Sequence, residues 1–258
     1  MKCGHGAGLG TNSETNWAGI LTILGEKFHV LAPDLIGYGN TDIPENIDLT
    51  HWEWTTARIR QVLELMDHNN IQKAHLVGNS MDGVISFSAA IYAPDRFNKI
   101  ITMGSAGGEL KELTPELVRA TNFDKDPTVQ NLKNILISFM YDESIIINIL
   151  DNIEDRYEKV MRKEVREIFP KLFAQSPTEY MFSPSNLMRI KQKVLLIHGY
   201  EDRLVPKESS LTLLEHIPNA QLVLLKQCGH WAQIEQKDRF IQLVEQFLSV
   251  KETADSLK

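Results

Sequence analysis

Cysteine is scarce in this chain, which contains only Cys3 and Cys228 among its 258 residues. A small secreted domain held together by disulfides would carry more cysteines, and a core of this size is stable without a disulfide or a metal. Long hydrophobic runs are lacking too, since stretches such as residues 194–197 are far shorter than the roughly 20 residues of a membrane span. The first six residues lack the apolar segment of a signal peptide. We therefore expect a cytoplasmic protein with no membrane partner.

Positive charge is also in deficit. The chain has 27 lysine and arginine residues against 34 aspartate and glutamate residues, which gives a formal net charge of −7. Because a nucleic-acid-binding surface needs a basic patch, this balance argues against a nucleic-acid partner. It is compatible with a local basic pocket for an anionic small molecule.

Short apolar runs alternate with amphipathic helical stretches along most of the chain. This alternation is typical of βαβ units, which form a mostly parallel sheet with helices on both faces. We expect strands at residues 28–33, 73–79, 98–104, 193–199 and 219–226, and helices at residues 51–68, 82–92, 207–216 and 234–249.

The alternation stops between residues 106 and 190, where the sequence is helical and rich in charge, methionine and phenylalanine. Because the strand pattern resumes afterwards, we predict a core domain made of residues 1–105 and 191–258. A helical lid, residues 106–190, is inserted in this core. A separate helical domain is the alternative interpretation of the same segment.

The start of the chain is unusual for such a sheet. The segment His5-Gly6-Ala7-Gly8 has the composition of a loop that leaves a strand, although only Met1 to Gly4 precede it. A sheet of this type usually has a whole strand at this place and an antiparallel hairpin before it. We therefore expect N-terminal strands to be missing, because the sheet is shortened or because the numbered start lies within a longer gene product.

The most informative segment is an apolar run that breaks at Gly78-Asn79-Ser80 and continues into a helix. This pattern predicts a nucleophile elbow, a strained turn that exposes a serine hydroxyl at a helix N-terminus. Ser80 could otherwise simply cap its helix. The usual pattern is Gly-x-Ser-x-Gly, and Asp82 stands where the second glycine is expected. We expect the Asp82 side chain to displace the elbow, and its charge to weaken a nearby histidine base by favouring imidazolium.

Two further residues complete a candidate catalytic triad. A serine hydroxyl attacks a carbonyl when a base takes its proton and a third group orients that base. Asp202 and His230 follow Ser80 in the chain, each at the end of a predicted strand. This order is that of α/β-hydrolases, and the carboxyl ends of parallel strands meet at one crevice. Asp202 could instead be a turn residue, with Glu201 as its substitute, and His230 a structural loop residue.

The remaining site groups are backbone amides and other histidines. An oxyanion needs two amide donors, and the candidates are Met81, directly after the nucleophile, and Ala7 in its glycine-flanked loop. A plain glycine turn is the alternative for the loop around Ala7. We expect His29, His75, His198 and His216 to be structural or exposed.

Five segments of the chain match one known family when taken together. They are His5-Gly6-Ala7-Gly8, residues 32–39, Gly78-Asn79-Ser80-Met81, residues 199–203, and Cys228-Gly229-His230-Trp231-Ala232-Gln233. In these segments the sequence resembles the α/β-hydrolases that act on meta-cleavage products of aromatic degradation, and the resemblance covers almost the whole chain. It implies hydrolysis of a carbon–carbon bond in a small-molecule 2-hydroxy-6-oxo-2,4-dienoate, giving a 2-hydroxydienoate and a carboxylic acid. No metal or organic cofactor is expected, and a homo-oligomer would suit the family.

The resemblance also implies roles for individual residues. Ser80 would act at the C6 ketone as nucleophile or activator, His230 as acid and base, and Asp202 as the orienting group. Asn16, Asn79 and Arg156 would bind the carboxylate and enol oxygen of the dienoate, and Phe139 and Trp231 would wall the pocket.

The planar guanidinium of an arginine can donate two parallel hydrogen bonds to the two oxygens of a carboxylate, which supports the role implied for Arg156. Arg156 could instead lie on the solvated face of a charged helix, Asn16 could cap a helix, and Asn79 could be a turn residue.

Two other functions are compatible with the sequence. One is a carboxylesterase or lactonase with the same triad. The other is a catalytically silent protein of this fold that binds a small ligand, with Asp82 and the short start as marks of lost activity.

Overall fold

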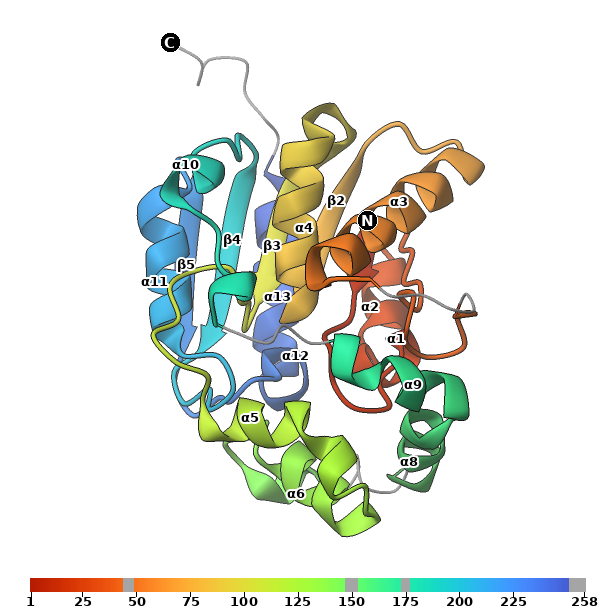
Figure 1. Ribbon diagram of the computed structural model, residues 1–258. Coiled ribbons are helices and arrows are strands. Elements are labelled where there is room, and N and C mark those ends of the chain that lie inside the picture. The colour runs from red at the N-terminus through yellow and green to blue at the C-terminus, as the bar shows by residue number, and fades with distance from the viewer. Residues whose placement is uncertain (44–48, 147–152, 173–176, 251–258) are drawn as a thin grey trace.

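A five-stranded parallel sheet forms the centre of the protein (Figure 1). The structure is a computed structural model that describes residues 1–43, 49–146, 153–172 and 177–250. The strands are β1 (Lys2–Gly4), β2 (Ala74–Asn79), β3 (Phe97–Met103), β4 (Lys193–Gly199) and β5 (Ala220–Leu225). Neighbouring strands pair in parallel in the order β1-β2-β3-β4-β5.

Helices surround this sheet. The α-helices are α1 (Ser13–Asn16), α2 (Leu21–Gly25), α3 (His51–His68), α4 (Met81–Tyr92), α5 (Pro115–Thr121), α6 (Val129–Ile137), α8 (Ile153–Met161), α9 (Lys163–Leu172), α10 (Pro184–Leu187), α11 (Lys207–His216), α12 (Ala232–Glu235) and α13 (Lys237–Ser249). Short 3₁₀ turns lie at Pro94–Arg96, Phe123–Lys125, Glu143–Ile146 and Pro177–Tyr180.

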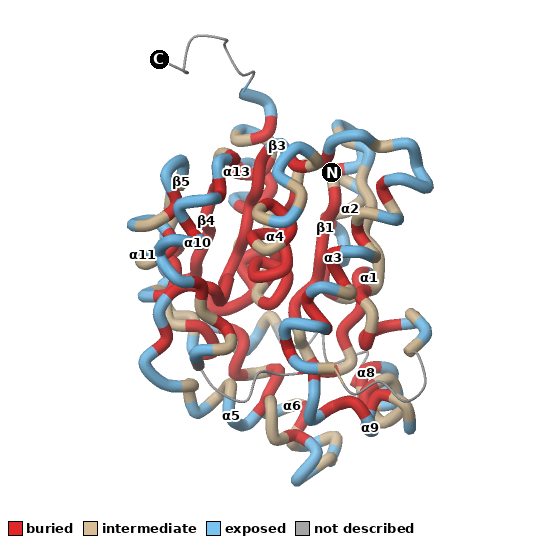
Figure 2. Tube along the Cα trace, turned by 45° about the horizontal axis from the view of Figure 1, so that its top comes forward, coloured by how far each residue is buried: buried red, intermediate tan, exposed pale blue. Residues whose placement is uncertain are grey.

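Both faces of the sheet are covered. Alternate strand residues point to opposite sides, so that Leu76 and Ile100 join a core with α3, α4 and α11. Val77 and Ile101 join a second core with α2 and α13. Figure 2 shows the central strands and α4 as mostly buried, while outer helices such as α11 carry exposed residues. This double burial explains the nearly continuous apolar strand sequences, and it confirms the predicted α/β fold with helices on both faces.

Most predicted elements agree with the structure to within one residue, but two do not. Residues 28–33 do not form a strand, because only Leu31 bridges to Lys2 before Pro33, which has no amide hydrogen to pair. The edge strand is instead β1, the three-residue segment Lys2–Gly4. The helix predicted over residues 234–249 is interrupted at Gln236, where the backbone leaves the helical region and α12 gives way to α13.

The described segment between β3 and β4 is helical. Helices α5, α6, α8 and α9 gather at the end of the molecule where the strands finish, whereas α10 lies apart from them beside α11 (Figure 1). Residues 147–152 and 173–176 of the predicted lid lie outside the described residues. None of the described helices has the length and apolar composition needed to cross a bilayer.

A buried ion pair joins β1 to the first turn of α4. The Lys2 ammonium donates to the Asp82 carboxylate, and both side chains are almost fully buried. Burial raises the pKa of Asp82, while the Lys2 charge and its hydrogen bond oppose that shift. Gly4 lies so close that a β-carbon there would overlap the Asp82 carboxylate. The short edge strand therefore supplies both the space and the counter-charge that Asp82 needs.

Removing Lys2 should be costly because it leaves a buried carboxylate without its partner. We expect Lys2→Met to lower the free energy of unfolding by about 3–5 kcal/mol, and Lys2→Met/Asp82→Gly to recover most of that loss. Urea unfolding of the three proteins measures both effects. Lys27→Met, which breaks the exposed Lys27–Glu245 pair, is the matched control and should cost less than about 1 kcal/mol. A Lys2→Met variant as stable as this control would contradict the prediction.

Candidate active site

Ser80 occupies a strained turn between β2 and α4. Its φ of 53° and ψ of −113° lie in a region that serine rarely adopts, as a nucleophile elbow requires. The turn is fixed by hydrogen bonds from the Ser80 amide to the Met103 carbonyl, at 2.9 Å, and from the Gly83 amide to the Ser80 carbonyl, at 3.0 Å. The expectation that Asp82 displaces the elbow is wrong. Its carboxylate binds Lys2 and accepts from Ser86 at 3.4 Å, and it has no hydrogen bond to His230.

His230 and Asp202 meet at the carboxyl ends of β5 and β4. The His230 Nδ1 atom lies 2.7 Å from an Asp202 carboxylate oxygen, and both side chains are buried. The other Asp202 oxygen accepts from the amides of Leu204 and Val205 at 2.9 and 3.0 Å. Burial alone would raise the pKa of Asp202, but the charges and hydrogen bonds of His230 and His198 hold it well below its usual range. Asp202 is therefore a fixed anion that can orient His230 and stabilise its imidazolium.

His198 is a second neighbour of Asp202 that the sequence did not single out as a site residue. Its Nε2 lies 3.4 Å from the Asp202 carboxylate and donates to the Val205 carbonyl at 2.9 Å. Its Nδ1 lies 2.7 Å from the Ser210 hydroxyl. Because both nitrogens are engaged inside the protein, His198 holds the Asp202 loop in place. The only sequence signal is its position at the end of β4, four residues before Asp202.

Gly104 was also missed, although it makes the His230–Asp202 contact possible. Its φ is 52°, and a β-carbon there would lie 2.9 Å from His230 Nδ1 and 3.1 Å from Asp202 Oδ2. Any larger residue would push into the hydrogen bond between them. Nothing in the local sequence distinguishes this glycine from an ordinary turn residue.

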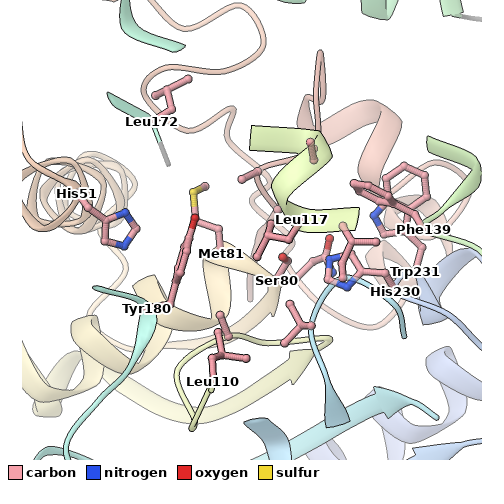
Figure 3. A pocket seen from close by; sticks show the side chains of 18 residues that line it. His51, Ser80, Met81, Leu110, Leu117, Phe139, Leu172, Tyr180, His230 and Trp231 are labelled. Carbon is pink, nitrogen blue, oxygen red and sulfur yellow. The ribbon is translucent and has the colours of Figure 1, made fainter. Parts of the chain in front are cut away.

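Ser80 and His230 face the same pocket (Figure 3). Predicted site residues Ala7, Asn79, Met81, Phe139 and Trp231 line it as well. Much of the remaining wall is aliphatic and comes from Ala106, Leu110, Leu117, Leu172, Leu204 and Val205. Such a pocket can hold an apolar molecule against a small number of polar groups.

The two amides proposed for the oxyanion are held in different ways. Met81 is the first residue of α4, so its amide has no acceptor within the helix. Ala7 lies in a loop that the His5 side chain holds in place by two hydrogen bonds. The His5 Nδ1–H donates to the Gly6 carbonyl at 2.8 Å, and Nε2 accepts from the Leu35 amide at 3.0 Å. These bonds require a neutral imidazole, and burial lowers the pKa of His5 to about 4.

Arg156 lies behind the pocket wall and does not line the pocket itself. It is 1% exposed, which rules out the solvated helix face considered from the sequence. Its guanidinium stands over the Trp231 ring at 5.6 Å and donates to the Leu9 carbonyl at 3.4 Å. No carboxylate of the described residues forms an ion pair with it, and burial lowers its pKa to about 10. Arg156 is thus a buried cation available to an anionic ligand.

Asn16 and Asn79 are buried amides with spare hydrogen-bonding capacity. Asn16 is the last residue of α1, whose N-terminal cap is Asn12, so Asn16 does not cap a helix. Its Nδ2 has no hydrogen-bond partner among the described residues, and the same is true of Asn79 Oδ1. Asn79 reaches the pocket, whereas Asn16 is not among the pocket-lining residues.

Phe139 connects the helical segment to the loop that carries His230. Its carbonyl accepts from the His230 amide at 2.7 Å, and its ring packs edge-on against His230 and Trp231 at 5.4 and 4.7 Å. Glu235 accepts from the amides of Tyr141 and Gly229 at 2.6 and 2.5 Å. These contacts fix the pocket wall relative to the histidine.

No group of three or more His, Cys, Asp or Glu side chains in the described part of the chain could hold a metal ion.

Comparison with known proteins gives consistent relatives. The sequence matches the family described as alpha/beta hydrolase fold over residues 5–143 and 150–237. A 2-hydroxy-6-oxo-2,4-heptadienoate hydrolase of Pseudomonas putida strain F1 is 32% identical over 252 residues, covering 96% of this chain and 88% of the relative. A 2-hydroxy-6-oxononadienedioate/2-hydroxy-6-oxononatrienedioate hydrolase of Burkholderia vietnamiensis strain G4 is 32% identical over 255 residues, covering 95% and 85%.

A solved structure is similar as well. The 2-hydroxy-6-oxo-6-phenylhexa-2,4-dienoate hydrolase from Rhodococcus sp. strain RHA1 superposes with a TM-score of 0.93 at 36% identity. The match covers 96% of this chain and 90% of that chain. Similarity in sequence and similarity in structure thus point to the same group of enzymes.

The neutral state of His5 predicts a dependence of stability on pH. Because its folded pKa of about 4 lies below the usual 6.5, the contribution of His5 is complete above pH 6.5 and is lost as the pH falls towards 4. We expect this residue to account for a loss of roughly 2–3 kcal/mol of unfolding free energy between pH 7.5 and 4.5. Denaturant unfolding at both pH values measures the loss. His5→Asn should reduce it by that amount, whereas His68→Asn, at an exposed histidine of α3, should not.

Proposed function

The chain belongs to the α/β-hydrolase fold family and, within it, to the meta-cleavage product hydrolases, and on this premise we propose that it hydrolyses a carbon–carbon bond in a 2-hydroxy-6-oxo-2,4-dienoate. The products are a 2-hydroxydienoate and a carboxylic acid. The observation that carries this proposal is the His230–Asp202 hydrogen bond beside Ser80, in a pocket backed by Arg156, a cation with no ion pair among the described residues.

Ser80, His230 and Asp202 act as the catalytic triad in this proposal. The carbon leaving group departs only after the dienol becomes a ketone that can accept the electron pair of the breaking C5–C6 bond. His230 moves the proton for this tautomerisation, and Asp202 stabilises the imidazolium that forms. Ser80, or water that it activates, adds to C6. One water is consumed overall, and its oxygen ends in the carboxylic acid.

The oxyanion formed at C6 is stabilised by the amides of Ala7 and Met81. Both residues line the pocket beside Ser80, and the Met81 amide lies at the positive end of α4. The negative charge of Asp82 is neutralised locally by Lys2, so it does not oppose the developing oxyanion. This pairing also removes the main argument for a catalytically silent protein, which rested on Asp82.

The dienoate end of the substrate lies towards Trp231. Arg156 balances the dienoate carboxylate through the wall that Trp231 and Phe139 form. The spare Asn16 Nδ2 donates to the carboxylate, and the spare Asn79 Oδ1 accepts from the enol hydroxyl. A buried guanidinium that pairs with no carboxylate in the described part of the chain supports this assignment, because an isolated buried charge is unfavourable until an anion pairs with it.

The helical segment 106–190 acts as the lid of this site. Leu110, Leu117 and Phe139 of this segment line the pocket, and the described helices α5 and α6 cover the ends of the strands.

We also propose that the protein works in the cytoplasm as a homo-oligomer, as the family resemblance suggests. Sedimentation of the purified protein tests the oligomeric state.

The proposed activity predicts rapid loss of the coloured dienolate absorbance when purified protein is mixed with a 2-hydroxy-6-oxodienoate. We expect Ser80→Ala to reduce kcat by at least about 10³-fold, because the nucleophile and its base act as a unit. Stopped-flow absorbance measures the rate. Absence of turnover beyond the Ser80→Ala control would rule out the proposal, and higher kcat/KM on simple aryl esters would select a carboxylesterase or lactonase instead.

The role of Arg156 predicts a binding defect. We expect Arg156→Gln to lower kcat/KM for the dienoate by about 30- to 1000-fold, because it removes the charge that balances the substrate carboxylate. Steady-state kinetics measure this loss, and circular dichroism checks the fold. Arg166→Gln, on the exposed side of α9, is the control and should change kcat/KM less than twofold. Equal effects in the two variants would contradict the assignment.

A further inference from the structure

His51 is a polar side chain at the pocket that the proposed chemistry does not use. It is the first residue of α3, lines the pocket and is 5% exposed. Neither ring nitrogen has a hydrogen-bond partner among the described residues. Figure 3 shows the ring on the opposite side of the pocket from His230 and Trp231, with Ser80 between them.

A buried imidazole whose nitrogens bond to no described residue is unusual in a folded protein. Buried polar atoms are almost always hydrogen-bonded, and leaving one without a partner costs about 1–3 kcal/mol. The ring is also held firmly. The capping box of Thr50 and Glu53 fixes the first turn of α3, and Tyr180 and Trp52 pack against the ring at 5.2 and 5.7 Å. His51 therefore presents, in a fixed place, two hydrogen-bonding atoms that bond to no residue in the described ranges of the chain.

The ring is neutral, which determines what it can bind. Burial and the nearby Arg58 charge lower the pKa of His51 to about 4, against the opposing effect of Glu179. A neutral imidazole offers one donor and one acceptor. Such a pair suits a hydroxyl, which can both donate and accept, better than it suits a carboxylate, which only accepts.

The Arg58 cation does not itself line this part of the pocket. Arg58 lies behind Met81, where its guanidinium donates to the Ile36 carbonyl at 3.1 Å and stands over the Tyr38 and Trp54 rings. None of the described lining residues is a lysine or an arginine. A carboxylate at His51 would accept from the one donor of the neutral ring and leave its acceptor nitrogen unused, whereas a hydroxyl can engage either nitrogen.

The position of His51 indicates which part of the substrate it meets. The reacting C6 carbon lies at Ser80, and the dienoate extends towards Trp231 and Arg156. The C6 substituent must then extend to the other side, where the aliphatic wall and His51 lie (Figure 3). This orientation rests on the proposed function.

We propose that His51 is a specificity-determining residue that hydrogen-bonds a neutral polar group, such as a hydroxyl, on an otherwise apolar C6 substituent of the dienoate. The substrate class is thus a ring-fission product whose substituent is a hydroxylated aryl or alkyl group. A substituent that ends in a carboxylate is disfavoured.

The test compares kcat/KM for four 2-hydroxy-6-oxodienoates whose C6 substituents are phenyl, 3-hydroxyphenyl, 4-hydroxyphenyl and carboxyethyl. In the wild-type protein we expect at least one hydroxyphenyl substrate to exceed the phenyl substrate by about tenfold, which is the effect of one net neutral hydrogen bond. His51→Leu should bring this ratio to about one while retaining phenyl turnover. His51→Gln, which keeps a neutral donor and acceptor, should retain part of the preference.

His68→Leu is the matched control, since His68 is an exposed histidine at the other end of α3. It should leave the hydroxyphenyl-to-phenyl ratio unchanged. A wild-type ratio near one, a ratio that survives in His51→Leu, or a preference for the carboxyethyl substrate would overturn the proposal while leaving the carbon–carbon hydrolase intact. Failure of the wild-type protein to cleave any of the four dienoates would remove the proposed function, and this inference with it.

Discussion

The left-handed backbone at Ser80 is the constraint on which the rest of the site depends. A serine holds this conformation only when its surroundings impose it, and here the first turn of α4 is fastened to β1 by the pair Lys2–Asp82. Asp82 lies near the helix N-terminus, where the macrodipole favours a carboxylate, and Lys2 neutralises its charge. The pair replaces the close glycine contact usual at this place, so the elbow keeps both its shape and its electrostatic balance.

The parts of the fold that local pattern controls could be predicted from the sequence. β4 and α3 lie where apolar periodicity and capping residues place them. The short edge strand could not be predicted in the same way, because three residues that begin with a buried lysine carry no strand signal. The neighbouring run 28–33 has a stronger signal but makes only one bridge. Its failure to form a strand depends on Pro33 and on pairing with β1, which is a tertiary effect.

The same distinction applies to the site. Ser80, Asp202 and His230 each follow a strand, so their convergence could be inferred from parallel topology alone. The roles of Gly104 and His198 depend on contacts across different strands, and no local motif marks them. The partner of Asp82 lies 80 residues away in the chain. Sequence reasoning identified Asp82 as a departure from the motif but misjudged its effect, because it had no means of finding the compensating lysine.

The bond from the His230 amide to the Phe139 carbonyl has a wider consequence. It joins the His230 loop firmly to the helical segment, and Glu235 reinforces the junction by accepting from the amides of Tyr141 and Gly229. Exchange of whole helices between relatives, by recombination or by design, therefore has to preserve this junction on both sides. Changes elsewhere in the helical segment can leave this junction intact, whereas changes between Phe139 and Tyr141 alter the support of the histidine loop.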